Sequence, residues 1–524
     1  MMIIKSPYPD ITIPDTAFTP FVLQKASTLP DKPALIDGPT GRTITYSELL
    51  DSIKRVAASL QKRGFGKGDV LGILSPNCPE YAIAFHAVSW LGGIVTPINP
   101  LYTEKEIAHQ LNDCFARFLV TVPSCLEKSD EAARAAGVEE VFVFGEADGA
   151  TPFASLFGDD RVEEQVPVNP AEDLVALPYS SGTTGLPKGV MLTHRNLVAN
   201  IKQMEGLDYF FETDTLICVL PLFHIYGLVV VLNMGLYTGA TIVTMPRFEL
   251  EAFLKTAQDY NVSLAHLVPP IVLGLSKHPI VDEYQLPKLR TIFSGAAPLG
   301  EELTRACMDR LGCQIRQGYG MTETSPVTHS SPAPPFNIKF GSVGVCAPST
   351  ECRIVSLETG EDLPPMERGE VCVRGPQIML GYLNKPEATA STIDEDGWLH
   401  TGDIGYADHD GHFFIVDRAK ELIKYKGFQV PPAELEAVLL THPCVADAAV
   451  IPCRDDEAGE VPKAILVLKT ETTEAEILDF VSERVAPYKR IRYVEFIEQI
   501  PKSPSGKILR RVLVEKERSK TAAT

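Results

Sequence analysis

The chain has 524 residues, which is too long for one hydrophobic core, so at least two packed units are expected. Hydrophobic residues make up 45% and charged residues 22% of it, a composition typical of a globular enzyme and unlike that of a disordered or fibrous protein. The formal net charge of -20 repels a phosphate backbone, so no nucleic acid partner is expected.

The first 330 residues alternate predicted strands with predicted helices. Apolar and amphipathic patterns predict, in chain order, a strand at 33–37, a helix at 45–60, a strand at 70–74, a helix at 80–91 and strands at 93–97 and 174–179, followed by helices at 196–203 and 249–260 and a strand at 289–293. Such alternation is the signature of doubly wound α/β sheets, and it predicts two α/β units.

From Gly341 onward the pattern changes to short strands separated by Gly and Pro, such as 352–356 and 369–374, which indicates a small β-rich unit. A strand at 413–417 is followed by the charged segment Arg418-Ala-Lys-Glu421, a hairpin-like stretch at 422–430 and a helix that begins near Pro432. We therefore expect a large domain over residues 1–417 and a separate small α+β domain over residues 418–524.

Three features bear on cellular location. The N-terminal 30 residues lack the apolar run of a signal peptide. Residues 215–246 contain no Asp, Glu, Lys or Arg, but Pro221, His224 and several glycines interrupt them, so they predict buried helix and strand and no integral membrane segment. The 11 cysteines show no C-x-x-C pair and no Cys/His cluster, and reduced thiols in a cytoplasmic protein are expected.

The segment Tyr179-Ser-Ser-Gly-Thr-Thr-Gly-Leu-Pro-Lys-Gly-Val190 follows a predicted strand and combines glycines, hydroxyls and one lysine. Glycines let the backbone approach an anion, hydroxyl and amide groups donate to its oxygens, and Lys188 adds a positive charge. The spacing is not that of a Walker A loop. A flexible Gly/Ser/Thr loop is the plainer alternative, and the density of donors favours a phosphate site.

Three further motifs offer groups that suit a nucleotide. In Gln317-Gly-Tyr-Gly-Met-Thr-Glu323, Tyr319 is suited to stack on a base and Glu323 to hold a phosphate-bound metal, although Gly-Tyr-Gly turns are common. Trp398-Leu-His-Thr-Gly-Asp403 ends in an acid that could bind ribose hydroxyls or belong to a turn. In Pro501-Lys-Ser-Pro-Ser-Gly-Lys507, the turn presents Lys507 ahead of a basic helix, where a solvated tail is the usual alternative.

Together, in this order and at these separations, the motifs resemble the adenylate-forming superfamily, and most closely the 4-coumarate:CoA ligases with their bacterial and fatty-acyl relatives. The resemblance spans essentially the whole chain. It implies a large N-terminal domain of two α/β subdomains and a β-barrel-like subdomain, hinged near Lys420 to a small mobile C-terminal domain. It also implies an acid:CoA ligase that forms an acyl-AMP, releases pyrophosphate and then makes an acyl-CoA thioester.

The resemblance assigns roles to individual residues. The ATP phosphates would be held by Ser180, Ser181, Gly182, Thr183, Thr184 and Lys188, with Thr322 at the α-phosphate and Glu323 on Mg²⁺. Gly295, Ala296, Gln317, Gly318 and Tyr319 would frame the adenine, and Asp403 and Arg418 would bind the ribose. Catalysis would use His224, Lys424, Gln429 and Lys507, and CoA would contact Arg247, Lys426 and Gly427. The acyl pocket would comprise Tyr226, Val230, Ala296, Gly318, Gly320, Pro326 and Val327.

The predicted cofactors and partners are ATP, Mg²⁺, CoA and a small carboxylic acid of the 4-coumarate or cinnamate type, bound by a monomer or homodimer. Phe293 and Val230 stand where the plant coumarate enzymes have a lysine and a small polar residue. The change indicates a more apolar pocket and an aliphatic or unsubstituted aromatic acid, with ordinary core packing as the alternative explanation of both residues. A medium- or long-chain fatty acid is the alternative substrate. An acyl-AMP ligase serving a carrier protein and a luciferase-like oxygenase are rivals within the superfamily. An inactive nucleotide-binding scaffold is the rival from another class.

Overall fold

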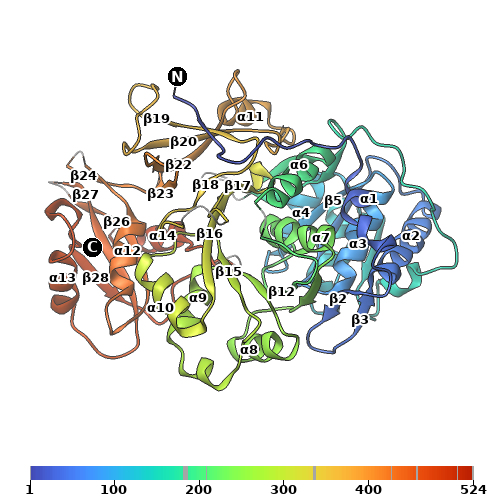
Figure 1. Ribbon diagram of the computed structural model, residues 1–524, viewed down its shortest axis with the longest axis horizontal. Helices are drawn as coiled ribbons and strands as arrows, with labels where there is room; N and C mark the ends of the chain where they lie inside the picture. The colour runs from blue at the N-terminus through green and yellow to red at the C-terminus, as the bar shows by residue number, and fades with distance from the viewer. Residues whose placement is uncertain are drawn as a thin grey trace.

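The computed structural model describes residues 2–180, 187–207, 209–333, 338–426, 428–455, 458–503 and 506–521. It contains four sheets (Figure 1). Two large sheets and a five-stranded sheet precede residue 420, and a further five-stranded sheet follows it. The predicted α/β fold with a separate C-terminal α+β unit is confirmed.

The first large sheet has a parallel centre and an antiparallel edge. Its strand order is β10 (Tyr179–Ser180), β11 (Lys188–Thr193), β9 (Leu174–Ala176), β5 (Ile94–Ile98), β4 (Val70–Leu74), β6 (Ala116–Thr121), β7 (Glu140–Val143) and β8 (Thr151–Pro152), with β21 (Gly381–Tyr382) also paired to β11. The helices of this part of the chain are α1 (Phe18–Val22), α2 (Tyr46–Lys62), α3 (Pro79–Trp90), α4 (Glu104–Asp113), α5 (Leu126–Ala136) and α6 (His194–Glu205). The strand predicted at 174–179 is split into β9 and β10.

The second large sheet has the order β18 (Val345–Cys346), β17 (Val327–Ser330), β16 (Gln314–Gly320), β15 (Thr291–Ser294), β14 (Leu264–Leu267), β12 (Thr215–Cys218), β13 (Thr241–Thr244), β2 (Pro33–Asp37) and β3 (Thr43–Thr45). Its helices are α7 (Met234–Thr238), α8 (Leu250–Asp259), α9 (Pro269–Lys277) and α10 (Glu301–Leu311). Because β2 pairs with β13, the first predicted strand belongs to the second sheet, and the two α/β units interleave.

Helix boundaries follow from local capping chemistry. Thr45 accepts a hydrogen bond from the Glu48 backbone N–H, while the Glu48 carboxylate accepts from the Thr45 N–H, so α2 starts with a capping box. Thr193 and Asn196 form the equivalent pair at the start of α6. These polar caps explain why both predicted helices begin within two residues of the observed ones.

The apolar stretch 215–246 is confirmed as buried strand and helix: β12, a π-helical segment at Tyr226–Asn233, α7 and β13. The Asn233 side chain donates to the Leu228 carbonyl, five residues earlier, which supports the wider π-helical turn. Across the part of the chain that the structure describes, helices are too short or too polar to cross a membrane.

The third unit is an antiparallel sheet in the order β1 (Ile4–Lys5), β19 (Glu351–Val355), β20 (Gly369–Arg374), β22 (Leu399–Ala407) and β23 (Phe413–Arg418), with α11 (Pro386–Thr392) beside it. It lies at the top of Figure 1, above the junction of the other units. Residues near the start of the chain thus pair with β19, more than 340 residues away.

The C-terminal unit, orange to red in Figure 1, has the strand order β25 (Phe428–Val430), β24 (Ile423–Tyr425), β27 (Gly459–Leu468) and β26 (Val445–Asp455), with β28 (Tyr493–Phe496) on β27. Its helices are α12 (Pro432–Leu440), α13 (Glu474–Ser482) and α14 (Arg510–Thr521). Separate apolar clusters, one including Leu435 and Ile477 and one including Ile500 and Leu513, give this unit a core of its own.

Candidate active site

A cavity of about 680 Å³ lies where the carboxyl ends of β14, β15 and β16 meet the third sheet and the C-terminal unit. Ligands of open α/β sheets bind at this end of the strands. The cavity brings together most of the residues predicted for the site: Ser180, Lys188, His224, Tyr226, Val230, Gly295, Ala296, Gly318, Tyr319, Gly320, Thr322, Glu323, Pro326, Val327, Arg418, Lys420 and Lys507.

The predicted phosphate loop is described only at its two ends. Ser180 on β10 pairs directly with Lys188 on β11, so both ends of the loop stand at the cavity. The Lys188 ammonium lies 4.1 Å from the centre of the Tyr382 ring. The predictions for Ser181, Gly182, Thr183 and Thr184 fall outside the described residues.

Glu323 is 4% exposed, and its carboxylate accepts a 2.8 Å hydrogen bond from the Tyr382 hydroxyl. One buried carboxylate beside the predicted phosphate loop suits Mg²⁺, which is usually bound by one or two carboxylates together with substrate phosphates. The Tyr382 bond orients one carboxylate oxygen, while the Glu323 residue borders the cavity. The donor set therefore fits a magnesium ion carried in with a nucleotide.

Tyr319 and Arg418, which line the cavity, form a connected group with Asp403, which is buried and is not itself a lining residue. The Tyr319 hydroxyl donates to Asp403 at 2.6 Å, and Arg418 Nε lies 3.2 Å from the other Asp403 oxygen. Burial raises the pKa of Asp403, while the Arg418 charge opposes that rise. Asp403 is thus a buried acceptor held between a phenol and a guanidinium, and its contact with a ribose stays a prediction.

Lys507 enters the cavity from the turn ahead of α14. The Ser503 N–H donates to the Lys507 carbonyl, and the Lys507 N–H donates to the Ser503 hydroxyl, which fixes the turn. Gly506 has a φ of +79°, and a Cβ there would lie 3.0 Å from Val268 Cγ2. Lys507 is exposed toward the cavity and not toward bulk water. Its pKa is lowered mainly by this loss of bulk water and secondarily by repulsion from Arg418.

His224 is held in a defined tautomer. Its Nδ1 accepts a 3.2 Å hydrogen bond from the Tyr226 backbone N–H, so the neutral ring carries its proton on Nε2. Burial, and secondarily the Lys507 charge, lowers the pKa of His224 to about 3. At neutral pH His224 therefore offers the cavity an uncharged N–H donor.

Aromatic side chains enclose the other end of the cavity. His266 is stacked against Phe293 and lies edge-on to Tyr226, while the π-helical segment places Val230 on the same wall. Gly295 is required here, because a Cβ would approach the Tyr226 ring to 2.8 Å. This end is apolar enough for a flat hydrophobic acid.

Several predicted residues lie outside the cavity wall. Lys424 and Gln429 pair across the β24–β25 hairpin and are exposed, as are Lys426 and, on the large domain, Arg247. The Gln317 side chain both donates to and accepts from the Leu299 backbone, so it braces the turn that follows β15. Gly427 falls outside the described residues.

Sequence reasoning missed several lining residues, among them Tyr209, His266, His329, Glu370, Tyr382 and His400. His266 is the most informative, because neither ring nitrogen has a hydrogen-bond partner among the described residues, although the side chain is 1% exposed. Burial, with the Arg290 charge second, lowers its pKa to about 3. A single histidine in a predicted strand carries no local signal that distinguishes a pocket wall from core.

The fold matches solved structures over almost its whole length. An anthranilate CoA ligase, AuaEII, in complex with anthranoyl-AMP aligns with a TM-score of 0.91 at 27% identity, covering 98% of this chain and 99% of that one. ATP-bound MatB from Rhodopseudomonas palustris aligns with a TM-score of 0.87 at 29% identity, covering 96% and 99%. The fold and site thus define an adenylate-forming enzyme.

Sequence comparisons identify the family. The AMP-binding enzyme model matches residues 22–383, and the AMP-binding enzyme C-terminal domain model matches residues 434–507. Relatives include 4-coumarate–CoA ligase 2 of Petroselinum crispum, 47% identical over 98% of this chain and 96% of that one, and the 4-coumarate–CoA ligase of Pinus taeda, 47% identical over 99% and 98%. The chain belongs to the AMP-binding enzyme family.

Proposed function

We propose that this AMP-forming acid–thiol ligase, which works through an acyl-adenylate, acts on acids of the 4-coumarate and cinnamate type. The observation that supports this substrate class is the cavity itself. One end has Lys188, Arg418 and Lys507 for a nucleotide, and the other has Tyr226, His266 and Phe293 around an apolar space. The relatives at 47% identity are named for 4-coumarate, which agrees with a flat aromatic acid.

In the first half-reaction a carboxylate attacks the α-phosphate of ATP and pyrophosphate leaves. The carboxylate is already a nucleophile, so the protein's task is to place it and to stabilise the charge that accumulates on the phosphate oxygens. We assign Lys507 and Thr322 to the α-phosphate and Lys188 with Ser180 to the leaving phosphates. Asp403 and Arg418 bind the ribose, and Tyr319 lies against the adenine.

Glu323 would hold Mg²⁺, which supplies further positive charge to the phosphates when bound. His224 would donate its Nε2–H to an oxygen of the substrate carboxylate or of the adenylate carbonyl. Its low pKa suits this role, because a neutral donor orients the acid without forming an ion pair that would weaken the nucleophile. These roles rest on the positions of the side chains around one cavity.

The second half-reaction needs different groups at the same place. Lys424 and Gln429 are exposed in this structure while Lys507 lines the cavity, an arrangement that suits the first half-reaction. Rotation of the C-terminal unit about Lys420 would withdraw Lys507 and bring in the β24–β25 hairpin. CoA would then contact Arg247, Lys426 and Gly427.

The test is a panel of cinnamates, benzoates and C6 to C16 fatty acids, each assayed for CoA thioester formation and for acid-dependent pyrophosphate exchange. We expect the highest kcat/KM with cinnamate-type acids. A fatty acid that exceeds every cinnamate in kcat/KM would replace the proposed substrate class, and exchange without thioester formation would contradict the use of CoA.

A further inference from the structure

The sequence shows no Cys/His motif, but within the described chain two groups of such residues gather in space: His329, Cys346 and Cys352, and Glu370, Cys372 and His400. The first group is the more distinctive. His329 is on β17, Cys346 on β18 and Cys352 on β19, so residues spread over 24 positions meet where the second large sheet joins the third sheet. All three are at most 1% exposed.

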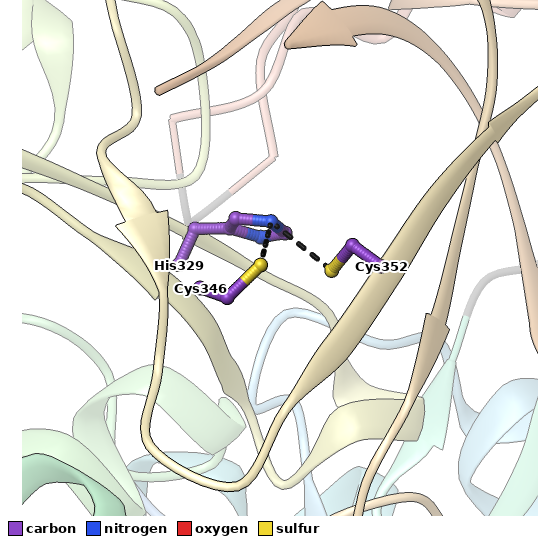
Figure 2. Close-up of side chains that lie close together, drawn as sticks. All are labelled: His329, Cys346 and Cys352. Atoms are coloured by element: carbon purple, nitrogen blue, oxygen red, sulfur yellow. Dashed lines mark hydrogen bonds between the residues drawn. The ribbon is translucent and has the colours of Figure 1, made fainter. Parts of the chain in front are cut away.

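Both sulfur atoms approach the same nitrogen. His329 Nε2 lies 3.6 Å from Cys346 Sγ and 3.3 Å from Cys352 Sγ, as the dashed lines in Figure 2 show. The three atoms lie within 4.8 Å of one another. Tetrahedral zinc, with Zn–S of about 2.3 Å and Zn–N of about 2.0 Å, holds N and S about 3.5 Å apart and two sulfurs about 3.8 Å apart. The two nitrogen–sulfur distances therefore match edges of a zinc coordination tetrahedron, and the two sulfurs lie within 4.8 Å of each other.

The histidine is oriented as a metal ligand would be. The Thr328 hydroxyl donates to the Tyr319 carbonyl, and its oxygen lies 2.9 Å from His329 Nδ1, so it accepts the Nδ1–H. The proton is then on Nδ1, and the Nε2 lone pair faces the two sulfurs. A hydrogen bond from the second ring nitrogen is the usual support of a metal-bound histidine.

Neutral Nε2 has one lone pair and can accept one good hydrogen bond, yet two sulfur atoms lie close to it. Cys352 is the nearer donor to Nε2, and the other acceptor near Cys346 Sγ is the Ile4 carbonyl oxygen, at a long 3.9 Å. A cation would use the lone pairs of all three atoms. The strands also hold the ligands rigidly, since His329 pairs directly with Cys346 and Cys352 is paired to both β1 and β20.

The second group, Glu370, Cys372 and His400, is explained by an ion pair between His400 and Glu370. His400 Nδ1 lies 2.8 Å from Glu370, and the His400 side chain is 31% exposed at the rim of the cavity. This geometry is that of a histidine–carboxylate ion pair. Cys372, on the opposite face of the sheet from Cys352, serves as a matched control.

We propose that His329, Cys346 and Cys352 bind one Zn²⁺ ion that joins the second large sheet to the third sheet. Binding releases two protons as both thiols become thiolates, and the imidazole binds through Nε2. The described residues supply three ligands, so a small molecule such as water completes a tetrahedron. Because Tyr319 pairs with His329 in the β16–β17 ladder, the ion would brace a strand that lines the nucleotide cavity.

The experiment uses the full chain, reduced, freed of metal with a chelator and titrated with Zn²⁺ alone against a chromophoric competitor. We expect one equivalent to bind and the unfolding midpoint to rise by about 2 °C or more at saturating metal. Cys346→Ser and Cys352→Ser should each weaken binding by at least about a hundredfold. Cys372→Ser and the buried Cys307→Ser should bind as the parent does.

Zinc-edge X-ray absorption of the zinc-loaded parent chain identifies the ligand atoms directly. This measurement does not depend on whether the variants fold. Two sulfur ligands and at least one nitrogen ligand are expected. Failure to bind one equivalent, a first shell without sulfur, or unchanged affinity in both Cys346→Ser and Cys352→Ser would overturn the proposal. Loss of binding in Cys372→Ser alone would also overturn it, by moving the site to the other face of the sheet.

Discussion

At the scale of single residues, Lys507 is the side chain whose position most directly determines the proposed first step. Lys507→Ala should lower acid-dependent pyrophosphate exchange by about a hundredfold or more, as removal of a preorganised donor typically does. Conversion of supplied acyl-adenylate and CoA to thioester should remain near the parent rate. Lys516→Ala, an exposed lysine on α14, is the matched control. Parental exchange in Lys507→Ala would remove Lys507 from the mechanism.

The lowered pKa of Lys507 predicts a pH dependence. Its ordinary value is 10.5, and removal from bulk water lowers it, so the charge that adenylation needs is lost as the pH rises through a value below 10.5. Pyrophosphate exchange should therefore decline on the alkaline side. In Lys507→Arg, whatever rate remains should lack this decline, because arginine stays protonated. The same alkaline decline in both proteins would assign it to another group.

The acyl end of the cavity predicts a substrate preference. Val230 lines it and offers no hydrogen bond, and an unpaired hydroxyl costs about 1 to 3 kcal/mol to desolvate, or roughly tenfold to a hundredfold in binding. Cinnamate should therefore be used at least as efficiently as caffeate, and Val230→Ser should shift preference toward 4-coumarate. His266 is the other lining side chain near Val230 that could bond a phenolic hydroxyl. His266→Phe removes that group and should therefore shift preference away from 4-coumarate. A Val230→Ser protein with lowered stability and an unchanged substrate ratio would make Val230 ordinary core.

At the scale of elements, the turn Arg418–Glu421 joins β23 to the C-terminal unit. The Glu421 N–H donates to the Arg418 carbonyl, and the Ala419 N–H donates to Gly402 on β22. If the units rotate about Lys420, then Lys420→Pro, which fixes φ, should spare pyrophosphate exchange and lower thioester formation.

Lys420→Ala separates this hinge effect from the loss of a charge, because alanine keeps the backbone free. It should retain more thioester formation than Lys420→Pro. Equal loss of both half-reactions in Lys420→Pro, or equal behaviour of the two variants, would place the hinge elsewhere.

At the scale of the whole molecule, a buried ion pair connects the hinge region to the C-terminal core. Arg510 lies 2.8 Å from Glu436 and 3.0 Å from Glu421, and the side chains of Arg510 and Glu436 are each 10% exposed. Burial raises the pKa of Glu436 from 4.5 to about 7, although Arg510 opposes the rise. Without Arg510, an ionised Glu436 would therefore destabilise the folded state.

Arg510→Met should lower the free energy of unfolding by about 3 to 5 kcal/mol, as loss of one partner of a buried pair typically does. Since the folded pKa of Glu436 exceeds its unfolded value, its contribution to stability is present below pH 4.5 and is lost as the pH rises through about 7. Removing Arg510 should raise the pKa of Glu436 further. The free energy of unfolding that Arg510→Met loses should therefore be larger at pH 8 than at pH 5.

The exposed neighbour Arg511, whose side chain is 77% exposed, supplies the control Arg511→Met, which should change stability little. The double variant Arg510→Met with Glu436→Leu should recover part of the loss in stability, because the buried carboxylate nearest to Arg510 is removed together with it. Thermal unfolding at both pH values checks this, and a loss independent of pH would contradict the account.

The sequence by itself determined much of this protein. Strands at 33–37, 70–74 and 369–374 have the predicted bounds, because continuous apolar runs between polar turns fix local structure. The motif residues Lys188, Tyr319, Glu323 and Lys507 were predicted because each belongs to a short segment rich in Gly, Pro, Ser or Thr, a composition that can be recognised in the local sequence.

Only the tertiary structure decided which distant residues meet. β2 joins a sheet whose other strands, apart from β3, begin after residue 214, and His266 and Tyr382 line the cavity although their local sequences resemble core. The group His329, Cys346 and Cys352 has no motif spacing, since three strands of two different sheets bring it together. Strand pairing is set by burial over the whole chain, so contacts of this kind cannot be obtained from local periodicity.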